Sequence, residues 1–141
     1  MAIDTDRDNG RHAVVAVIVE KCKFLVIRRS ELVRAPGLLC FPGGGIELGE
    51  SWESAIRREM LEELSLEVLI GPCLWTSVTR WGTTLEWILC ARKPGSHPKA
   101  APAEVAEVLW MTESELLDRS DLLGSLPDFF QALSVGEFRI D

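Results

Sequence analysis

The chain has 141 residues, enough for one domain with a proper hydrophobic core. Its 47% hydrophobic and 26% charged residues are typical of a globular protein, and its formal net charge of −7 argues against general binding to nucleic acid polymers or anionic membranes. The four cysteines are far apart and form no CxxC pair, which argues against a zinc site or a disulfide framework and predicts buried free thiols in a reducing cytosol.

Residues 1–11 form a polar N-terminal segment, and residues 12–141 are expected to form a single domain. The N-terminal segment lacks the basic and apolar regions of a signal peptide, and the chain has no apolar run of membrane-spanning length. We therefore expect a cytoplasmic protein without a membrane partner.

The first strands are expected before residue 42. Ala13 to Val19 is a continuous valine-rich run, typical of a strand buried on both faces, and Phe24 to Ile27 reads as a second strand after a short turn. The second strand ends in Arg28 and Arg29. A pair of arginines there is usually solvent-facing charge, and the alternative is contact with an anionic substrate. A loop and a short extended segment follow, up to Phe41.

A glycine-rich turn at 42–45 leads into a helix for which Ser51 is the expected N-cap. Glu59, Glu62 and Glu63 share one arc of this helix at 100° per residue. The apolar residues expected to face the core are Ile56, Met60, Leu61 and Leu64.

Three carboxylates on one arc repel each other by roughly 0.2–0.5 kcal/mol per pair, and the helix dipole disfavours them in its second half. A divalent cation among them would offset this cost. The alternative is a solvated face on which Arg58 and Glu62 form an ordinary i,i+4 ion pair.

Three further strands are expected after the helix: the first is Leu66–Ile70, closed by Gly71-Pro72, and the second is Leu74–Arg80. The latter pairs with Thr83–Ala91 around Trp81-Gly82. Aromatic residues in a hairpin are usually packing residues, but Trp81, beside the turn glycine, is the best candidate for stacking on a base.

Residues 93–103 form a Pro/Gly-rich loop before a strand at Glu104–Trp110. Thr112 and Glu115 have the spacing of a capping box, and Ser125-x-x-Asp128, with Pro127 in the first turn, is expected to start a last helix that ends at Gly136. Strands and helices interleave, so the pattern predicts an α/β domain with a mixed β-sheet and helices on both sides.

The segment from residue 44 to residue 66 resembles the Nudix box, G-x5-E-x7-R-E-U-x-E-E-x-G-U with U apolar. Its positions are filled by Gly44, Glu50, Arg58, Glu59, Met60, Glu62, Glu63 and Leu66, and Pro42-Gly43 precede them. Ser65 stands in place of the box glycine, a helix C-terminal position that favours φ > 0. The resemblance implies the Nudix α/β/α sandwich over essentially the whole chain.

The resemblance also implies a metal site. Glu59 and Glu63 would hold Mg²⁺ or Mn²⁺ together, Glu62 borders the same site, and the main-chain carbonyl of Gly43 is a further ligand by family analogy.

Arg58 and Glu50 are expected to pair and to orient the ligand carboxylates. Family members often recruit one more acid shortly before a tryptophan; Glu104 is the first choice here and Glu107 the second, against the alternative of a charge on a strand edge. The general base is left open among Glu62, Glu63 and Glu104.

The function implied is a metal-dependent pyrophosphohydrolase that cleaves a nucleoside diphosphate linked to X, giving a nucleoside monophosphate and phospho-X or pyrophosphate. The alternatives are a catalytically silent Nudix domain that senses a nucleotide, and a Ca²⁺-binding or structural domain. The chain has no tyrosine, and Pro72 lies close to the box, which favours nucleoside triphosphates over dinucleoside polyphosphates and ADP-ribose. We expect a small nucleotide-type substrate and no nucleic acid polymer, and leave open whether the protein is a homodimer.

Overall fold

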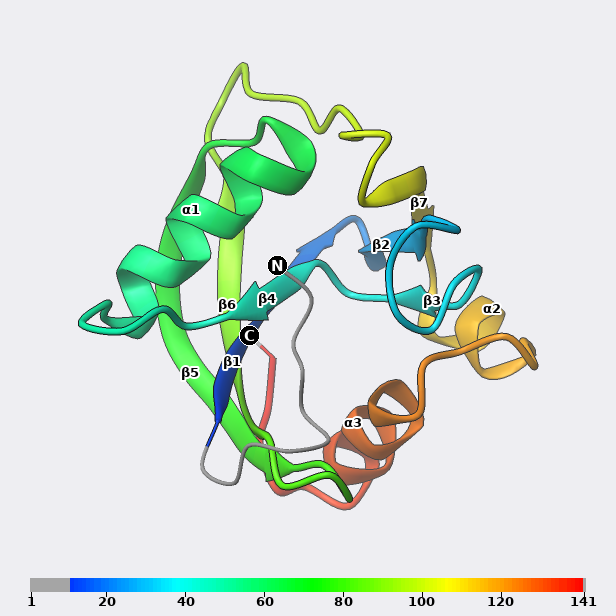
Figure 1. The fold of residues 1–141 in the computed structure, drawn as a ribbon. Coiled ribbons are helices and arrows are strands. Elements are labelled where there is room, and N and C mark those ends of the chain that lie inside the picture. The colour runs from blue at the N-terminus through cyan, green and yellow to red at the C-terminus, as the bar shows by residue number, and fades with distance from the viewer. Residues whose placement is uncertain (1–10, 141) are drawn as a thin grey trace.

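The computed structural model describes residues 11–140, so the polar segment predicted at 1–11 lies, apart from Arg11, outside the described residues. The strands are β1 (His12–Glu20), β2 (Lys23–Arg29), β3 (Leu39–Cys40), β4 (Gly43–Gly45), β5 (Val68–Val78), β6 (Thr84–Arg92) and β7 (Val105–Met111). The helices are α1 (Trp52–Leu64), α2 (Glu113–Leu117) and α3 (Ser125–Ser134), and Figure 1 shows α1 and α3 on opposite sides of the strands.

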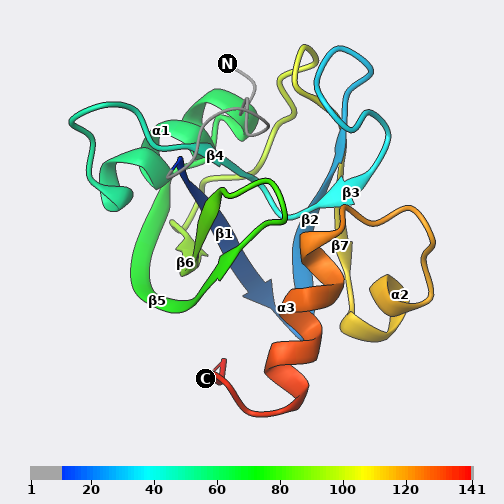
Figure 2. The same cartoon turned by 60° about the horizontal axis from the view of Figure 1, so that its bottom comes forward.

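The strands form one mixed sheet in the order β3-β2-β1-β6-β5, with β4 paired to β1 and β7 paired to β2. β1 and β6 are parallel, whereas the other pairs are antiparallel. On one edge β1 changes partner along its length: residues 13–15 pair with β4, and residues 19–20 pair with β2. The sheet therefore divides beyond the end of β4, as the separation of β2, β3 and β7 from β5 and β6 in Figure 2 also shows.

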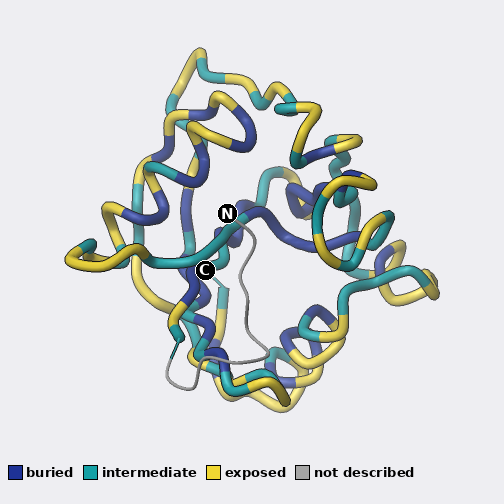
Figure 3. Tube along the Cα trace, viewed as in Figure 1, coloured by how far each residue is buried: buried dark blue, intermediate teal, exposed yellow. Residues whose placement is uncertain are grey.

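The core lies on both faces of β1. Val14, Ala16 and Ile18 point into a cluster that includes the buried face of α1, whereas Ala13 and Val17 point into a second cluster under α3. Alternate residues of a strand face opposite sides of a sheet, so an uninterrupted apolar run fills both clusters. The expected mixed sheet with a helix on each face is thus confirmed, and Figure 3 shows the buried segments running through its middle.

Aromatic side chains fill the cluster under α3. Trp87 is buried and stacks on Phe129 with ring centroids 4.8 Å apart, and Phe41 meets Phe129 edge to face at 5.3 Å. These contacts tie α3 to β6 and to the segment before β4. The prediction that most hairpin tryptophans are packing residues holds for Trp87.

Helix α1 begins and ends as the sequence predicts. The Ser51 hydroxyl accepts a hydrogen bond from the Ser54 N–H (3.1 Å), and Ser65 adopts the left-handed conformation with φ 50°. The prediction that Leu61 faces the core is wrong, since 53% of this side chain is exposed. Ile56, Met60 and Leu64 are buried as predicted, and the buried arc also includes Glu59 and Glu63, each only 8% exposed.

Two of the predictions for individual elements are corrected. The predicted strands on either side of Gly71-Pro72 are one strand, β5, whose pairing with β6 shifts register there. Because β5 is an edge strand, a proline without an N–H is tolerated in it. The glycines after Pro42 form β4 rather than a turn. The last helix, α3, begins at Ser125 as predicted, and Gly124 is its N-cap.

The capping box of Thr112 and Glu115 is confirmed. All four cysteines are free, but the prediction of buried thiols holds only for Cys40 and Cys90, because Cys22 and Cys73 are exposed. Within residues 11–140, no helix combines the length and apolar character that crossing a bilayer requires.

Candidate active site

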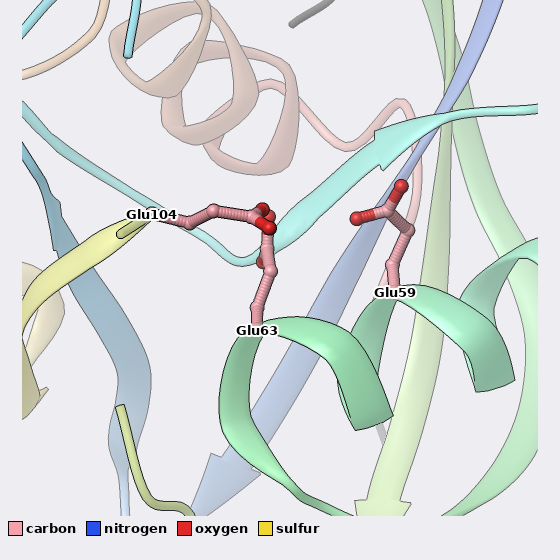
Figure 4. Close-up of side chains that lie close together, drawn as sticks. All are labelled: Glu59, Glu63 and Glu104. Carbon is pink, nitrogen blue, oxygen red and sulfur yellow. The ribbon is translucent and has the colours of Figure 1, made fainter. Parts of the chain in front are cut away.

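Three carboxylates converge beside β4. Glu59 and Glu63 lie one turn apart on the buried face of α1, and Glu104 immediately precedes β7. One oxygen of each lies within 4.8 Å of the others. Figure 4 shows the Glu104 side chain reaching across to the Glu63 carboxylate, with Glu59 beside them.

The loop at 93–103 brings Glu104 to the helix. The Lys99 N–H donates to the main-chain carbonyl of Leu64 (2.7 Å), and the Ala101 N–H donates to that of Glu63 (2.9 Å). These bonds satisfy helix-end carbonyls that have no partner within α1. The same contacts that finish the helix thus place Glu104 next to Glu63.

Ser30, buried at the end of β2, holds the other side of Glu104. Its N–H donates to the main-chain carbonyl of Glu104 (3.1 Å), and its hydroxyl donates to that of Ala103 (2.8 Å). The pairing of β2 with β7 shifts register at Arg28/Arg29, just before this point. Ser30 was not singled out by the sequence, because an isolated serine at a strand end carries no signal.

The glycines of β4 make room for the carboxylates. The Gly43 N–H donates to Glu63 Oε1 (3.2 Å), and a Cβ on Gly43 would collide with the Val14 carbonyl. A Cβ on Gly44 would overlap the Glu59 carboxylate. Only glycine permits this approach of the main chain to both side chains.

Arg58 organises the acidic groups around it. It donates to both carboxylate oxygens of Glu50 (2.8 and 2.9 Å) and to the carbonyl of Gly45 (2.8 Å). It also donates to Glu59 Oε2 (3.0 Å) and to Glu62 Oε1 (3.1 Å). The bond from Arg58 therefore orients the Glu59 carboxylate, and Glu62 lies half-exposed at the border of the cluster.

Burial and mutual repulsion govern the charge of the cluster. Burial raises the pKa of Glu63 well above its usual range, and the nearby charge of Glu59 adds to this. Burial also raises the pKa of Glu59, although Arg58 partly opposes it. In contrast, the hydrogen bonds from Arg58 lower the pKa of Glu50. Two buried carboxylates with raised pKa values, set among hard oxygen atoms, fit a divalent cation.

The carboxylates form the floor of a cavity of about 1050 Å³. Arg29 lines one side, together with residues 32–35 of the following loop. Residues 78–81 at the tip of the β5–β6 hairpin line another side, and residues 123–125 before and at the start of α3 line a third. The guanidinium carbon of Arg80 lies 4.7 Å from the centre of the Trp81 ring, and half of Trp81 is exposed.

Of the predicted substrate contacts, Arg29 and Trp81 line the cavity but Arg28 does not. Arg28 pairs instead with Glu107 and Asp121, so Glu107 also lies away from the carboxylate cluster. The sequence predicts pocket walls at residues 28–38 and 74–88, and both segments do line the cavity, but it did not single out Arg34 and Arg80 within them. The adjacency of Arg80 to the turn at Trp81-Gly82 was the available signal.

Comparison with known proteins identifies the family. The family model of the NUDIX domain matches residues 10–133. The putative 8-oxo-dGTP diphosphatase 2 of Mycobacterium tuberculosis is 32% identical over 108 residues, covering 74% of this chain and 75% of that protein. An RNA pyrophosphohydrolase of a Sulfurovum species is 44% identical over 139 residues, covering 95% and 76%. The crystal structure of a MutT protein from Methanosarcina mazei has the same fold, with a TM-score of 0.77 at 24% identity over 93% of this chain and 97% of that one. The chain therefore belongs to the Nudix family and is a hydrolase that acts on phosphoric anhydrides.

Proposed function

We propose that this protein hydrolyses nucleoside triphosphates to a nucleoside monophosphate and pyrophosphate, with Mg²⁺ or Mn²⁺ at the carboxylate cluster. The observation that carries this proposal is the convergence of Glu59, Glu63 and Glu104 on the floor of a cavity whose walls carry arginines. Cationic walls attract a polyphosphate, whereas an acidic floor repels it unless a cation lies between them.

Glu59 and Glu63 would hold the cation, with Glu62, Glu104 and the Gly43 carbonyl as the further ligands available beside them. When bound, the cation would neutralise phosphate charge and make a water molecule more acidic. Arg58 keeps Glu59 in one orientation, since it holds Glu50 and the Gly45 carbonyl at the same time. Removing a group that orients a metal ligand commonly lowers the activity or the metal affinity by roughly 10- to 100-fold.

We propose Glu104 as the general base that takes a proton from the attacking water, with Glu62 and Glu63 as the other candidates. Glu104 reaches the cluster from outside α1, so its carboxylate faces the floor from the opposite side to Glu59 (Figure 4). A general base must lie within hydrogen-bond reach of the proton that it takes, and the bonds of the 93–103 loop and of Ser30 hold Glu104 beside the cluster.

The substrate would lie with its phosphates over the floor and its base near the hairpin tip. Arg29 lines the cavity and would contact phosphate oxygens, and the exposed half of Trp81 would offer a face for stacking. The names of the two relatives, one acting on 8-oxo-dGTP and one on RNA, are compatible with a triphosphate group as the common element.

A hydrolysis screen tests the proposal. Canonical and oxidised nucleoside triphosphates, a 5′-triphosphorylated RNA, nucleotide sugars, ADP-ribose and dinucleoside polyphosphates are each incubated with Mg²⁺ or Mn²⁺, and the products are resolved by chromatography. We expect monophosphate and pyrophosphate from a nucleoside triphosphate, and none after the divalent cation is chelated. Turnover of only nucleotide sugars or ADP-ribose would contradict the assignment, and binding without products would favour the nucleotide sensor.

A further inference from the structure

Arg28 lies behind the cavity, at a point where four segments meet. Its Nη1 donates to the Gly37 carbonyl (2.9 Å) and to Asp121 Oδ2 (3.1 Å), and its Nε donates to Glu107 Oε1 (3.0 Å). The residue itself belongs to β2, and its partners belong to the loop at 30–38, to β7 and to the segment that joins α2 to α3. One guanidinium thus connects parts of the chain up to 93 residues apart.

The contact with Gly37 holds the first wall of the cavity. The loop at 30–38 leaves β2 and returns to it: the Gly37 N–H donates to the Arg29 carbonyl (2.9 Å), and the Arg29 N–H donates to the Leu38 carbonyl (2.9 Å). Residues 32–35, which line the cavity, lie between these anchor points. Arg28 adds a side-chain bond to the returning arm of the loop.

The contact with Asp121 holds the second wall. The Asp121 main-chain carbonyl accepts from the Leu39 N–H (2.8 Å), and the Leu123 N–H donates to the Leu39 carbonyl (2.8 Å). Arg119 holds the same carboxylate through two bonds of 3.0 and 2.8 Å. Leu123 and Gly124, which follow Asp121 closely, also line the cavity.

We propose that Arg28 is a positioning residue that fixes the two walls relative to each other and thereby sets the affinity for the nucleotide, without touching it. A single nitrogen, Nη1, bonds to both walls, so removing it takes one side-chain contact from each wall at the same time, while the main-chain bonds remain. The carboxylate floor is built by α1 and the loop at 93–103, neither of which contacts Arg28 through the bonds described. The proposal rests on the proposed function for its substrate, but not for the geometry of the walls.

Glu107 provides a matched control. Its bond to Arg28 has about the same length as the other two, although it is more exposed than they are, and Glu107 belongs to β7 and lies outside the cavity lining. Glu107→Gln therefore removes one ion pair of Arg28 and leaves both wall contacts in place. A general effect of losing surface charge would appear in this variant as well.

The kinetic test compares Arg28→Met, Asp121→Asn and Glu107→Gln on the substrate found in the screen. For Arg28→Met we expect KM to rise about tenfold, the factor that one charge-assisted hydrogen bond contributes, with kcat within about twofold. Asp121→Asn raises KM in the same direction, and the double variant with Arg28→Met raises it no further than Arg28→Met alone. Glu107→Gln leaves KM within about twofold, and Arg28→Lys, which can bond one wall at a time, gives an intermediate KM.

Amide hydrogen exchange of the metal-free protein provides a readout that needs no substrate. We expect Arg28→Met to speed exchange at Gly37 and Leu123, and Glu107→Gln to leave both unchanged. If the wild-type protein hydrolyses no nucleotide, the proposed function fails, and the exchange rates still decide the positioning role. A fall in kcat at unchanged KM, or equal effects of Arg28→Met and Glu107→Gln in both measurements, would overturn it.

Discussion

The floor of the cavity and its walls differ in how they are assembled. The floor comes mainly from one stretch of 21 consecutive residues, 43–63, in which the glycines of β4 pack on the carboxylates of α1. The walls come from four separate places: the end of β2, the loop after it, the hairpin tip at 78–81 and the start of α3. The floor is therefore specified by local spacing, and the walls by how distant segments meet.

This difference separates chemistry from substrate choice. Residues held by neighbours on the same helix keep their geometry when surface loops change, whereas a wall of four segments can be remodelled by a change in any one of them. We accordingly expect substitutions in the floor to act on kcat and on metal affinity, and substitutions in the walls to act on KM.

The largest effect is expected in the floor, from Glu59→Gln. A neutral amide in place of this carboxylate weakens the hold on the cation, whose contribution to catalysis is several kcal/mol, so kcat should fall about a thousandfold. The measurement is steady-state hydrolysis together with Mn²⁺ binding followed by electron paramagnetic resonance. Turnover near the wild-type value would show that the carboxylate cluster is not needed for hydrolysis.

Gly44→Ala should reduce activity about 10- to 100-fold, the range seen when the support of a metal ligand is disturbed. The added Cβ would overlap the Glu59 carboxylate and force it to move. Gly124→Ala is the control for Mn²⁺ affinity, because its φ of −57° suits alanine and a Cβ there meets nothing within 4 Å. Equal Mn²⁺ affinity in the two variants would show that the close approach at Gly44 is unimportant.

Trp81→Ala tests the walls. Loss of a stacking face costs about 1–3 kcal/mol of binding free energy per base, so KM should rise at least about fivefold, with kcat little changed. Trp81→Phe keeps a stacking face and should recover most of the affinity. A loss of kcat instead would place this side chain in the reaction rather than in nucleotide binding.

The sequence predicts the floor better than the walls for a physical reason. The arc shared by Glu59 and Glu63 follows from helical periodicity, and the Ser51 and Ser65 helix ends follow from capping chemistry. Their burial was not predicted, because hydrophobicity alone assigns carboxylates to the exposed side and Leu61 to the buried one.

The walls depend on tertiary contacts that no local pattern encodes. Arg28 and Arg29 are adjacent and chemically identical, yet one lies behind the cavity and the other lines it, because successive strand residues point to opposite sides. Which of the two sides carries the cavity is decided by β7 and the α2–α3 segment, which are 76 to 93 residues away. Glu104 was located by family resemblance, and the bonds of Ser30 that hold it came only from the structure.

The smallest expected effect concerns thermal stability, and its sign depends on whether metal is bound. Burial and the charge of Glu59 raise the pKa of Glu63 in the folded protein, so above the pKa of the unfolded chain the ionised carboxylate destabilises the metal-free fold. Glu63→Gln removes that charge and can still accept the bond from the Gly43 N–H.

Without metal at pH 7, we expect the Glu63→Gln variant to melt a few degrees higher than the wild type, which corresponds to about 1 kcal/mol in a domain of this size. This gain in melting temperature should shrink as the pH falls toward about 4, where the wild-type carboxyl is protonated. At pH 7 in saturating Mn²⁺ it should reverse, because the cation stabilises only the protein that binds it. Thermal melts at both pH values, with and without Mn²⁺, measure this; a variant less stable than the wild type in metal-free buffer at pH 7 would show that the floor is not strained by its own charge.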